Sequence, residues 1–259
     1  MRAQLTVLGS GTSMGVPTIG CDCRVCLSTD PRDKRTRPSV LIEYDGHVVL
    51  IDTTPDFREQ AIRERIRRLD AVLYTHAHAD HILGLDDLRP LSFHRPNGKI
   101  PLYAREGTAE TIRNVFRYIF EAEYKFGGLA EVELRRIDGP VDLFGAVFEP
   151  ITVLHGDAEI YGFRFGSAAY LTDFSTVPEA SLTRLAALNL DVLFLDALRH
   201  KPHPTHSTVE NSLRIVERLR PKRAFFTHIC HDLAHEETNA SLPPHVRLAH
   251  DGLKLEFEI

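Results

Sequence analysis

Three imidazoles and one carboxylate fall within six consecutive residues of this chain. They are His76, His78, Asp80 and His81. The apolar residues 70–74 before them predict a short strand, and residues 82–85 after them predict the start of a helix. Protonated imidazoles at this spacing would repel one another, whereas a divalent cation would satisfy all four side chains. We therefore interpret the segment as part of a metal site at the carboxyl end of a strand, rather than as a solvated histidine-rich loop.

The composition is that of an ordinary globular chain. Its 259 residues are 43% hydrophobic and 26% charged, which predicts a single domain over 1–259. The net charge of −5 disfavours a nucleic-acid partner and leaves a homodimer open. No apolar run approaches the roughly 18 residues of a membrane helix, and no signal peptide is evident at the start. We expect a soluble cytoplasmic protein without a membrane partner.

The elements that must position these residues follow from periodicity and turn signals. Asp45-Gly46 between two apolar runs predicts a hairpin over 40–51. Helical patterns cover 55–68, 108–120, 178–188 and 208–219. Strand patterns cover 5–8, a run from 131 to 171, 192–195, 224–227, and an antiparallel pair over 246–259 that turns at Asp251-Gly252. This order predicts an α/β or α+β fold.

The string H-A-H-A-D-H resembles the signature of the metallo-β-lactamase superfamily of binuclear metallohydrolases. The resemblance extends to the segments 8–12, 50–52, 153–156, 170–173 and 225–228. Within the superfamily the chain looks like the PhnP-like phosphoribosyl cyclic-phosphate phosphodiesterase group, because Cys21-Asp22-Cys23-Arg24-Val25-Cys26 is paired with His231. The resemblance implies an αββα sandwich, with two mixed β-sheets and helices on the outer faces.

Seven candidate ligands are too many for one ion, and they suit two divalent ions that share a carboxylate and a solvent bridge. The resemblance implies that one ion is held by His76, His78 and His155, the other by Asp80, His81 and His228, and that Asp173 bridges them. Zinc or manganese in such a site lowers the pKa of bound water to about 7 and supplies hydroxide as the nucleophile. We interpret Asp52, at the end of an apolar strand, as an acceptor that orients a ligand imidazole.

The cationic segment 199–208 is a candidate for protonating the leaving group, because it carries histidines and leads into a helix. By match to the family pattern His206 is that acid. Asp80 is the second candidate for a catalytic role. His203 and Arg199 are candidates for contacting the substrate.

Three cysteines within six residues predict a structural zinc ion rather than a disulfide framework. Cys21, Cys23 and Cys26 need a fourth ligand, for which Cys230 and His231 are adjacent candidates. The resemblance favours His231. Such an ion would fix a zinc-binding loop over 12–38 as one wall of the active site. The nearby Gly9-Ser10-Gly11-Thr12-Ser13-Met14-Gly15 has its third glycine one residue out of place for a dinucleotide loop, and we interpret it as tight backbone turns.

These features predict a binuclear phosphodiesterase that hydrolyses a small cyclic phosphate or phosphodiester through a metal-bridging hydroxide. One alternative is tRNA 3′-end processing, which would normally need a basic flexible arm; the segment 84–101 is short for one. A second is hydrolysis of a thioester or lactone on the same metals. A third, outside the enzymes, is a metal-binding redox or scaffold protein.

Overall fold

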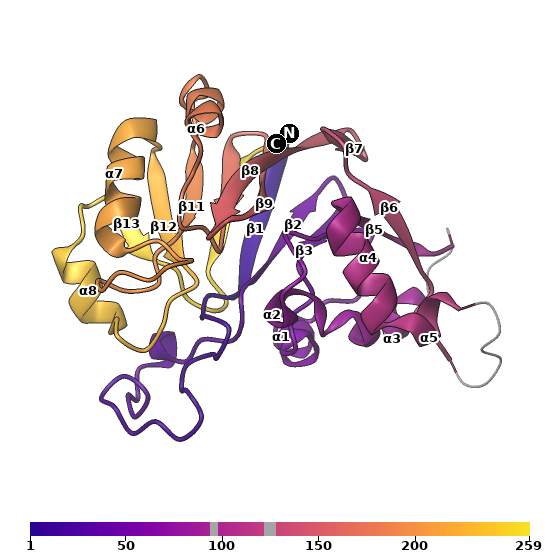
Figure 1. Ribbon diagram of the computed structural model, residues 1–259, viewed down its shortest axis with the longest axis horizontal. Helices are drawn as coiled ribbons and strands as arrows, with labels where there is room; N and C mark the ends of the chain where they lie inside the picture. The colour runs from indigo at the N-terminus through magenta and orange to yellow at the C-terminus, as the bar shows by residue number, and fades with distance from the viewer. Residues whose placement is uncertain (94–97, 122–127) are drawn as a thin grey trace.

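The computed structural model describes residues 1–93, 98–121 and 128–259. Two seven-stranded sheets pack face to face, with α1 to α5 beside the first and α6 to α8 beside the second (Figure 1). Phe148, Phe163, Phe165 and Phe194 lie buried between the sheets. The predicted αββα sandwich of two mixed sheets is confirmed. A single domain over 1–259 remains our proposal, which this shared core supports.

The first sheet has the strand order β14-β1-β2-β3-β4-β5-β6. Its strands are β1 (Arg2–Gly9), β2 (Ser39–Tyr44), β3 (His47–Ile51), β4 (Ala71–Leu73), β5 (Ile100–Ala104), β6 (Val132–Arg136) and β14 (Lys254–Glu258). The pairs from β14 to β3 are antiparallel and those from β3 to β6 are parallel. The hairpin at Asp45-Gly46 is confirmed, and both residues have positive φ (44° and 75°), as a type I′ turn requires.

The second sheet has the strand order β13-β12-β11-β10-β9-β8-β7. Its strands are β7 (Val141–Leu143), β8 (Ala146–His155), β9 (Ala158–Phe165), β10 (Ala168–Leu171), β11 (Val192–Asp196), β12 (Arg223–Thr227) and β13 (Val246–Leu248). Strands β7 to β10 pair antiparallel, and β10 to β13 pair parallel. The carboxyl ends of β10, β11 and β12 therefore meet at one edge.

The helices cover the outer faces of both sheets. They are α1 (Phe57–Arg63), α2 (Ala79–Ile82), α3 (Arg89–Ser92), α4 (Glu106–Val115), α5 (Arg117–Phe120), α6 (Glu179–Ala186), α7 (Val209–Leu219) and α8 (His235–Ser241), with the 3₁₀ turns η1 (Pro31–Asp33) and η2 (Leu85–Leu88). Helix α7 is capped at its N-terminus by Thr208, whose hydroxyl accepts from the Asn211 amide. None of the helices in the described ranges is long and apolar enough to cross a membrane.

Three predicted helices differ in extent. The helix expected over 55–68 ends at Arg63, because the chain takes a left-handed conformation at Arg65 (φ 56°). The helix expected over 108–120 begins at Glu106 and breaks at Phe116, where φ is −109° and ψ is 39°. The helix expected to start within 82–85 begins earlier, at Ala79, and gives way to a 3₁₀ turn.

The antiparallel pair predicted over 246–259 is wrong. Strand β13 joins the second sheet parallel to β12, and β14 joins the first sheet antiparallel to β1. The segment between them crosses from one sheet to the other. Its Asp251 is held by hydrogen bonds from Ser10 and Thr36, which are remote in sequence. Alternating apolar residues fit a hairpin and two strands of facing sheets equally well, so only these distant contacts decide between them.

Candidate metal centre and active site

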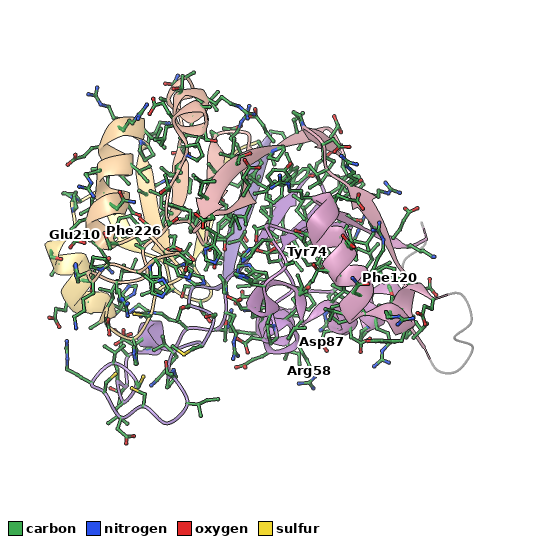
Figure 2. The ribbon with its side chains drawn as sticks, in the orientation of Figure 1. Arg58, Tyr74, Asp87, Phe120, Glu210 and Phe226 are labelled. Atoms are coloured by element: carbon green, nitrogen blue, oxygen red, sulfur yellow. The ribbon has the colours of Figure 1, made fainter. Side chains whose placement is uncertain are left out.

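The site residues follow the carboxyl ends of strands from both sheets. Tyr74 and Phe226 lie on the two halves of the sandwich (Figure 2), and each precedes a site histidine by two residues. Asp52 follows β3, and Asp173 follows β10 within two residues. Parallel strands end at the same edge of a sheet, so the two edges bring these side chains together.

Two clusters of potential ligand groups lie side by side, and two further groups that overlap them include His206; within each the ligand atoms are no more than 4.8 Å apart. The first consists of His76, His78 and His155, and the second of Asp80, His81, Asp173 and His228. The carboxylate of Asp173 faces both ways within the second: Oδ2 lies 3.2 Å from His81 Nε2, and Oδ1 lies 3.1 Å from His228 Nε2. Asp173 also lies within 4.8 Å of His155, so it joins the two clusters.

Three site residues occupy the left-handed backbone region that favours glycine. Asp52, Asp173 and His228 have φ values of 67°, 58° and 57°. Such conformations cost of order 1–3 kcal/mol each and persist where the surrounding structure fixes them. In this conformation the side chains of Asp173 and His228 approach to 3.1 Å, and Asp52 lies 2.7 Å from His81.

The site combines buried carboxylates with imidazoles whose pKa values are shifted in opposite directions. Burial, reinforced by the nearby His81, lowers the pKa of His76 well below its usual range. Burial would likewise lower the pKa of His228, but Asp173 and Asp80 outweigh it and raise that pKa to about 10. The same carboxylates raise the pKa of His81 well above its usual range against the effect of burial. Protons on His81 and His228 therefore balance the buried carboxylates, whereas His76 is neutral.

Among the described residues, several buried polar atoms of the site have no hydrogen-bond partner beyond the ionic contacts within the ligand set itself. They are His76 Nε2, Asp80 Oδ2, His81 Nε2 and His228 Nε2. A buried polar atom without a partner costs about 1–3 kcal/mol. Imidazole nitrogens and carboxylate oxygens are the ligands that zinc and manganese take, so the residues fit a pair of divalent cations. The individual ligand assignments remain predictions.

Hydrogen bonds outside the clusters fix which nitrogen faces inward in two of the imidazoles, those of His81 and His155. Asp52 Oδ2 lies 2.7 Å from His81 Nδ1, and both Asp52 oxygens accept from Thr75. The backbone carbonyl of Thr205 lies 2.9 Å from His155 Nδ1. In both histidines the Nδ1 proton is donated outward, which leaves the Nε2 lone pair for a metal. This arrangement agrees with the role predicted for Asp52.

His206 lies between the clusters, and its ring centroid is 4.8 Å from that of His155 and 4.6 Å from that of His228. Its Nδ1 is 2.8 Å from Oδ2 of Asp196, a fully buried carboxylate at the end of β11. The sequence analysis missed Asp196. The signal that could have found it is an apolar strand that ends in aspartate, Val192-Leu193-Phe194-Leu195-Asp196, as the strand before Asp52 does.

The remaining residues of the cationic segment take different positions. The ring of His203 lies 5.0 Å from that of His206, on the outer side of the site. Two nitrogens of Arg199 donate to the carbonyls of Lys201 and Pro202, so its guanidinium braces its own loop. His200 is exposed and lies 2.7 Å from Glu210, away from the metal-binding groups.

The cysteine cluster lies on the loop 12–38, which projects from the sandwich near α8 (Figure 1). The sulfur atoms of Cys21, Cys23 and Cys26 lie 3.2, 3.6 and 3.4 Å from His231 Nδ1. Cys230 stays outside this group, and its sulfur accepts from the Asp232 amide. Three thiols and one imidazole form the donor set of a structural zinc ion, and the geometry favours His231 over Cys230 as the fourth member.

The glycine-rich segment 9–15 packs closely against the end of the same loop. A Cβ on Gly11 would lie 2.7 Å from the Arg35 carbonyl, and one on Gly9 would overlap the Arg37 carbonyl. The Thr12 amide donates to the carbonyl of Ile229, immediately after His228. These contacts agree with the interpretation as tight backbone turns, because the glycines allow two backbones to approach closely.

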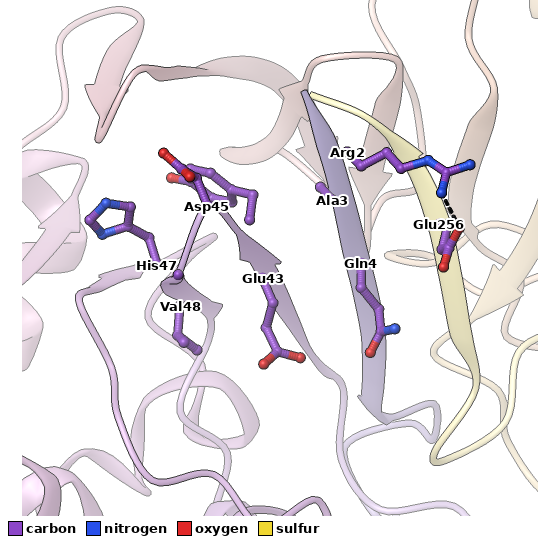
Figure 3. A pocket seen from close by; sticks show the side chains of 10 residues that line it. Arg2, Ala3, Gln4, Glu43, Asp45, His47, Val48 and Glu256 are labelled. Atoms are coloured by element: carbon purple, nitrogen blue, oxygen red, sulfur yellow. Dashed lines mark ion pairs between the residues drawn. The ribbon is translucent and has the colours of Figure 1, made fainter.

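A surface hollow of about 460 Å³ lies elsewhere, at the β1–β2–β3 end of the first sheet (Figure 3). Its rim carries charges of both signs, including the Arg2–Glu256 ion pair. It contains none of the predicted site residues.

Comparison with known proteins agrees with this geometry. A model described as the beta-lactamase superfamily domain matches residues 47–229. A crystal structure described as a new diphosphatase from the PhnP family superposes with a TM-score of 0.94 at 63% identity, covering 100% of this chain and 98% of that one. Zinc-bound PqqB from Methylobacterium extorquens has a TM-score of 0.78 at 20% identity, covers 97% and 99% of the two chains, and shows the fold alone.

One curated relative is longer. An octanoyltransferase from Porphyromonas gingivalis is 39% identical over 253 residues, which is 96% of this chain but 50% of that protein. The chain thus spans about half the length of this relative, and the name of the relative refers to that longer protein. The family match and the structure at 63% identity both indicate the same superfamily. The chain therefore belongs to the metallo-β-lactamase superfamily of metal-dependent hydrolases and, within it, to the PhnP family.

Proposed function

We propose that the protein is a metal-dependent phosphodiesterase that hydrolyses a small cyclic phosphate or phosphodiester. The observation that carries this proposal is His206, an imidazole that is held by the buried Asp196 at 2.8 Å and whose ring lies against those of His155 and His228. A phosphodiester releases a poor alkoxide leaving group, which needs a proton as the P–O bond breaks. Hydrolysis of thioesters or lactones would have less use for a cationic segment beside the metal centre.

Two bound divalent cations, zinc or manganese, would supply Lewis acidity and an acidified water. His76, His78 and His155 would hold one, Asp80, His81 and His228 the other, and Asp173 would contact both. Asp52 and the Thr205 carbonyl keep the ligand imidazoles in the required orientation.

His206 carries the proton. Because its Nδ1 faces the Asp196 carboxylate, Nε2 is the atom that donates to the leaving oxygen. Asp196 accepts from Nδ1 and holds the ring in position, as the carboxylate of a catalytic triad does.

We further propose one structural zinc ion on Cys21, Cys23, Cys26 and His231. It would anchor the loop 12–38 beside His228. A cytoplasmic location is part of the same proposal, supported by cysteines that form no disulfide.

A second candidate is hydrolysis of a diphosphate linkage, favoured by the relative at 63% identity that is described as a diphosphatase. Both reactions cleave a P–O bond on the same metals. They differ in the leaving group. A phosphate monoester leaves without being protonated, whereas an alkoxide needs a proton as it leaves.

The test is a substrate screen with purified protein loaded with zinc or manganese. Bis-p-nitrophenyl phosphate, cyclic nucleotides, ribose cyclic phosphates, diphosphate-linked nucleotides, thioesters and a tRNA precursor would be compared by kcat/KM. We expect the highest values on cyclic phosphates or small diesters. Preference for the diphosphates would select the second candidate, and preference for thioesters or tRNA would refute both.

A further inference from the structure

His203 sits on a segment whose backbone has little freedom. Pro202 and Pro204 flank it, and the proline rings fix the φ angles of these two residues. Because His203 precedes a proline, it is itself confined to extended conformations. Arg199 adds a brace by donating to the carbonyls of Lys201 and Pro202. The imidazole is therefore presented from a rigid stretch rather than from a mobile loop tip.

The hydrogen bonds of His203 define its tautomer. The backbone amide of Thr205 donates to His203 Nδ1 at 3.4 Å, and the Thr205 hydroxyl lies 3.2 Å from the same atom. An amide can only donate, so Nδ1 must be the acceptor. In a neutral imidazole the proton then resides on Nε2.

Thr205 holds its neighbours on both sides. Its amide and hydroxyl contact His203, its carbonyl lies 2.9 Å from His155 Nδ1, and the next residue is His206. One residue thus orients a candidate metal ligand and a second imidazole that lies 5.0 Å from the acid. Nε2 of His203 has no hydrogen-bond partner within the ranges that the structure describes.

We propose that His203 is a fixed hydrogen-bond donor, through Nε2, to an oxygen of the leaving group, and that Thr205 is the positioning residue that sets this tautomer. The proposal rests on the proposed function, because it concerns the leaving-group side of the same reaction. It assigns the substrate a leaving alcohol that carries a second oxygen, such as a sugar hydroxyl or a further phosphoryl group, close to the scissile bond.

The first measurement is the tautomer itself, by ¹⁵N–¹H correlation NMR of zinc-loaded protein with labelled histidine. We expect the Nε2–H form for His203 in the wild type and in Thr205→Ser, which keeps both the amide and the hydroxyl. Thr205→Val keeps the backbone amide and loses only the hydroxyl, so it should weaken the preference for the Nε2–H form without reversing it. The Nδ1–H form in the wild type would overturn the proposal.

The second measurement is kinetic and uses two probes. His203→Phe removes the donor, whereas His203→Gln carries an amide donor at about the Nε2 position. On a ribose cyclic phosphate that the wild type turns over, His203→Phe should lower kcat/KM by about 10-fold, the worth of one hydrogen bond, and His203→Gln should recover most of it. On bis-p-nitrophenyl phosphate, whose leaving group lacks a neighbouring hydroxyl, both variants should stay within about 2-fold. The matched control is His200→Phe, an exposed histidine on the same loop.

The outcomes separate this proposal from the one on which it rests. Equal losses on both probes, or no loss on either, would overturn the role of His203 while the phosphodiesterase assignment stands. Absence of any P–O bond hydrolysis by the wild type would overturn the proposed function and the leaving-group assignment together. In that case the tautomer measurement would still decide the role of Thr205.

Discussion

Removing the imidazole of His206 tests the mechanism most directly. His206→Ala should keep both catalytic metals, because the seven candidate ligands do not include it. It should lower kcat on a substrate with an alkoxide leaving group by roughly 10²–10⁴-fold, the usual worth of a general acid. At about 1.4 kcal/mol per decade this is roughly 3–5 kcal/mol of the activation barrier.

The structure indicates where in that range the loss should fall. The partner of His206 is a carboxylate with no solvent exposure at 2.8 Å, so the ring is strongly oriented. A fixed orientation raises the contribution of an acid, and we expect a loss near the upper end. Asp196→Asn keeps the size of the side chain but removes the negative charge, and it should reproduce a large part of the loss.

The assay compares two leaving groups on the same variant. p-Nitrophenolate leaves without protonation, so bis-p-nitrophenyl phosphate should show a much smaller loss than a cyclic phosphate. Metal content is measured in parallel by elemental analysis. His200→Ala is the matched control from the same loop and should behave as the wild type, because its ring faces Glu210. Equal losses on the two substrates, or loss of a metal, would remove His206 from the acid role and transfer it to His203 or Asp80.

The other predictions concern the metals. Elemental analysis of gently purified protein should find about three metals per chain, two catalytic and one structural; full activity with one or none would refute the two-metal proposal. Cys23→Ser should lose only the structural zinc ion and lower Tm, and unchanged zinc content and Tm would refute that site. Asp52→Asn should weaken metal binding by about 10–100-fold in a chelator competition, because His81 Nδ1 loses its negatively charged acceptor at 2.7 Å; equal affinity would contradict this. Metal binding should release protons and strengthen as pH rises, because the pKa of His228 is raised to about 10 and a ligand imidazole must lose its proton. Calorimetry at pH 7 in buffers of different ionisation enthalpy measures this release. Detection of no released proton would refute the prediction.

The sequence alone predicted the candidate metal sites wherever residues of one function are close together along the chain. The residues from His76 to His81 and the three cysteines could be predicted as metal sites, because such close spacing of potential ligands is typical of metal binding. The hairpin at Asp45-Gly46 was predictable for the same reason, since two adjacent residues determine the turn. Single residues such as His155 and Asp173 gained their assignments only from the resemblance to a family.

Contacts between distant segments were decided by the tertiary structure alone. The strands β13 and β14 have the same alternating pattern as a hairpin, yet the Asp251 contacts to Ser10 and Thr36 send them to different sheets. The strand pattern alone did not single out Asp196, because an aspartate after an apolar strand is common. Its role appears only when the fold brings it to His206. The tautomer of His203 depends on Thr205 two residues away, but it needs the proline-fixed backbone geometry to form. Spacing along the chain therefore determined which chemistry is available, whereas hydrogen bonds and packing across the sandwich determined which atom performs it, because those energies depend on distances that folding alone creates.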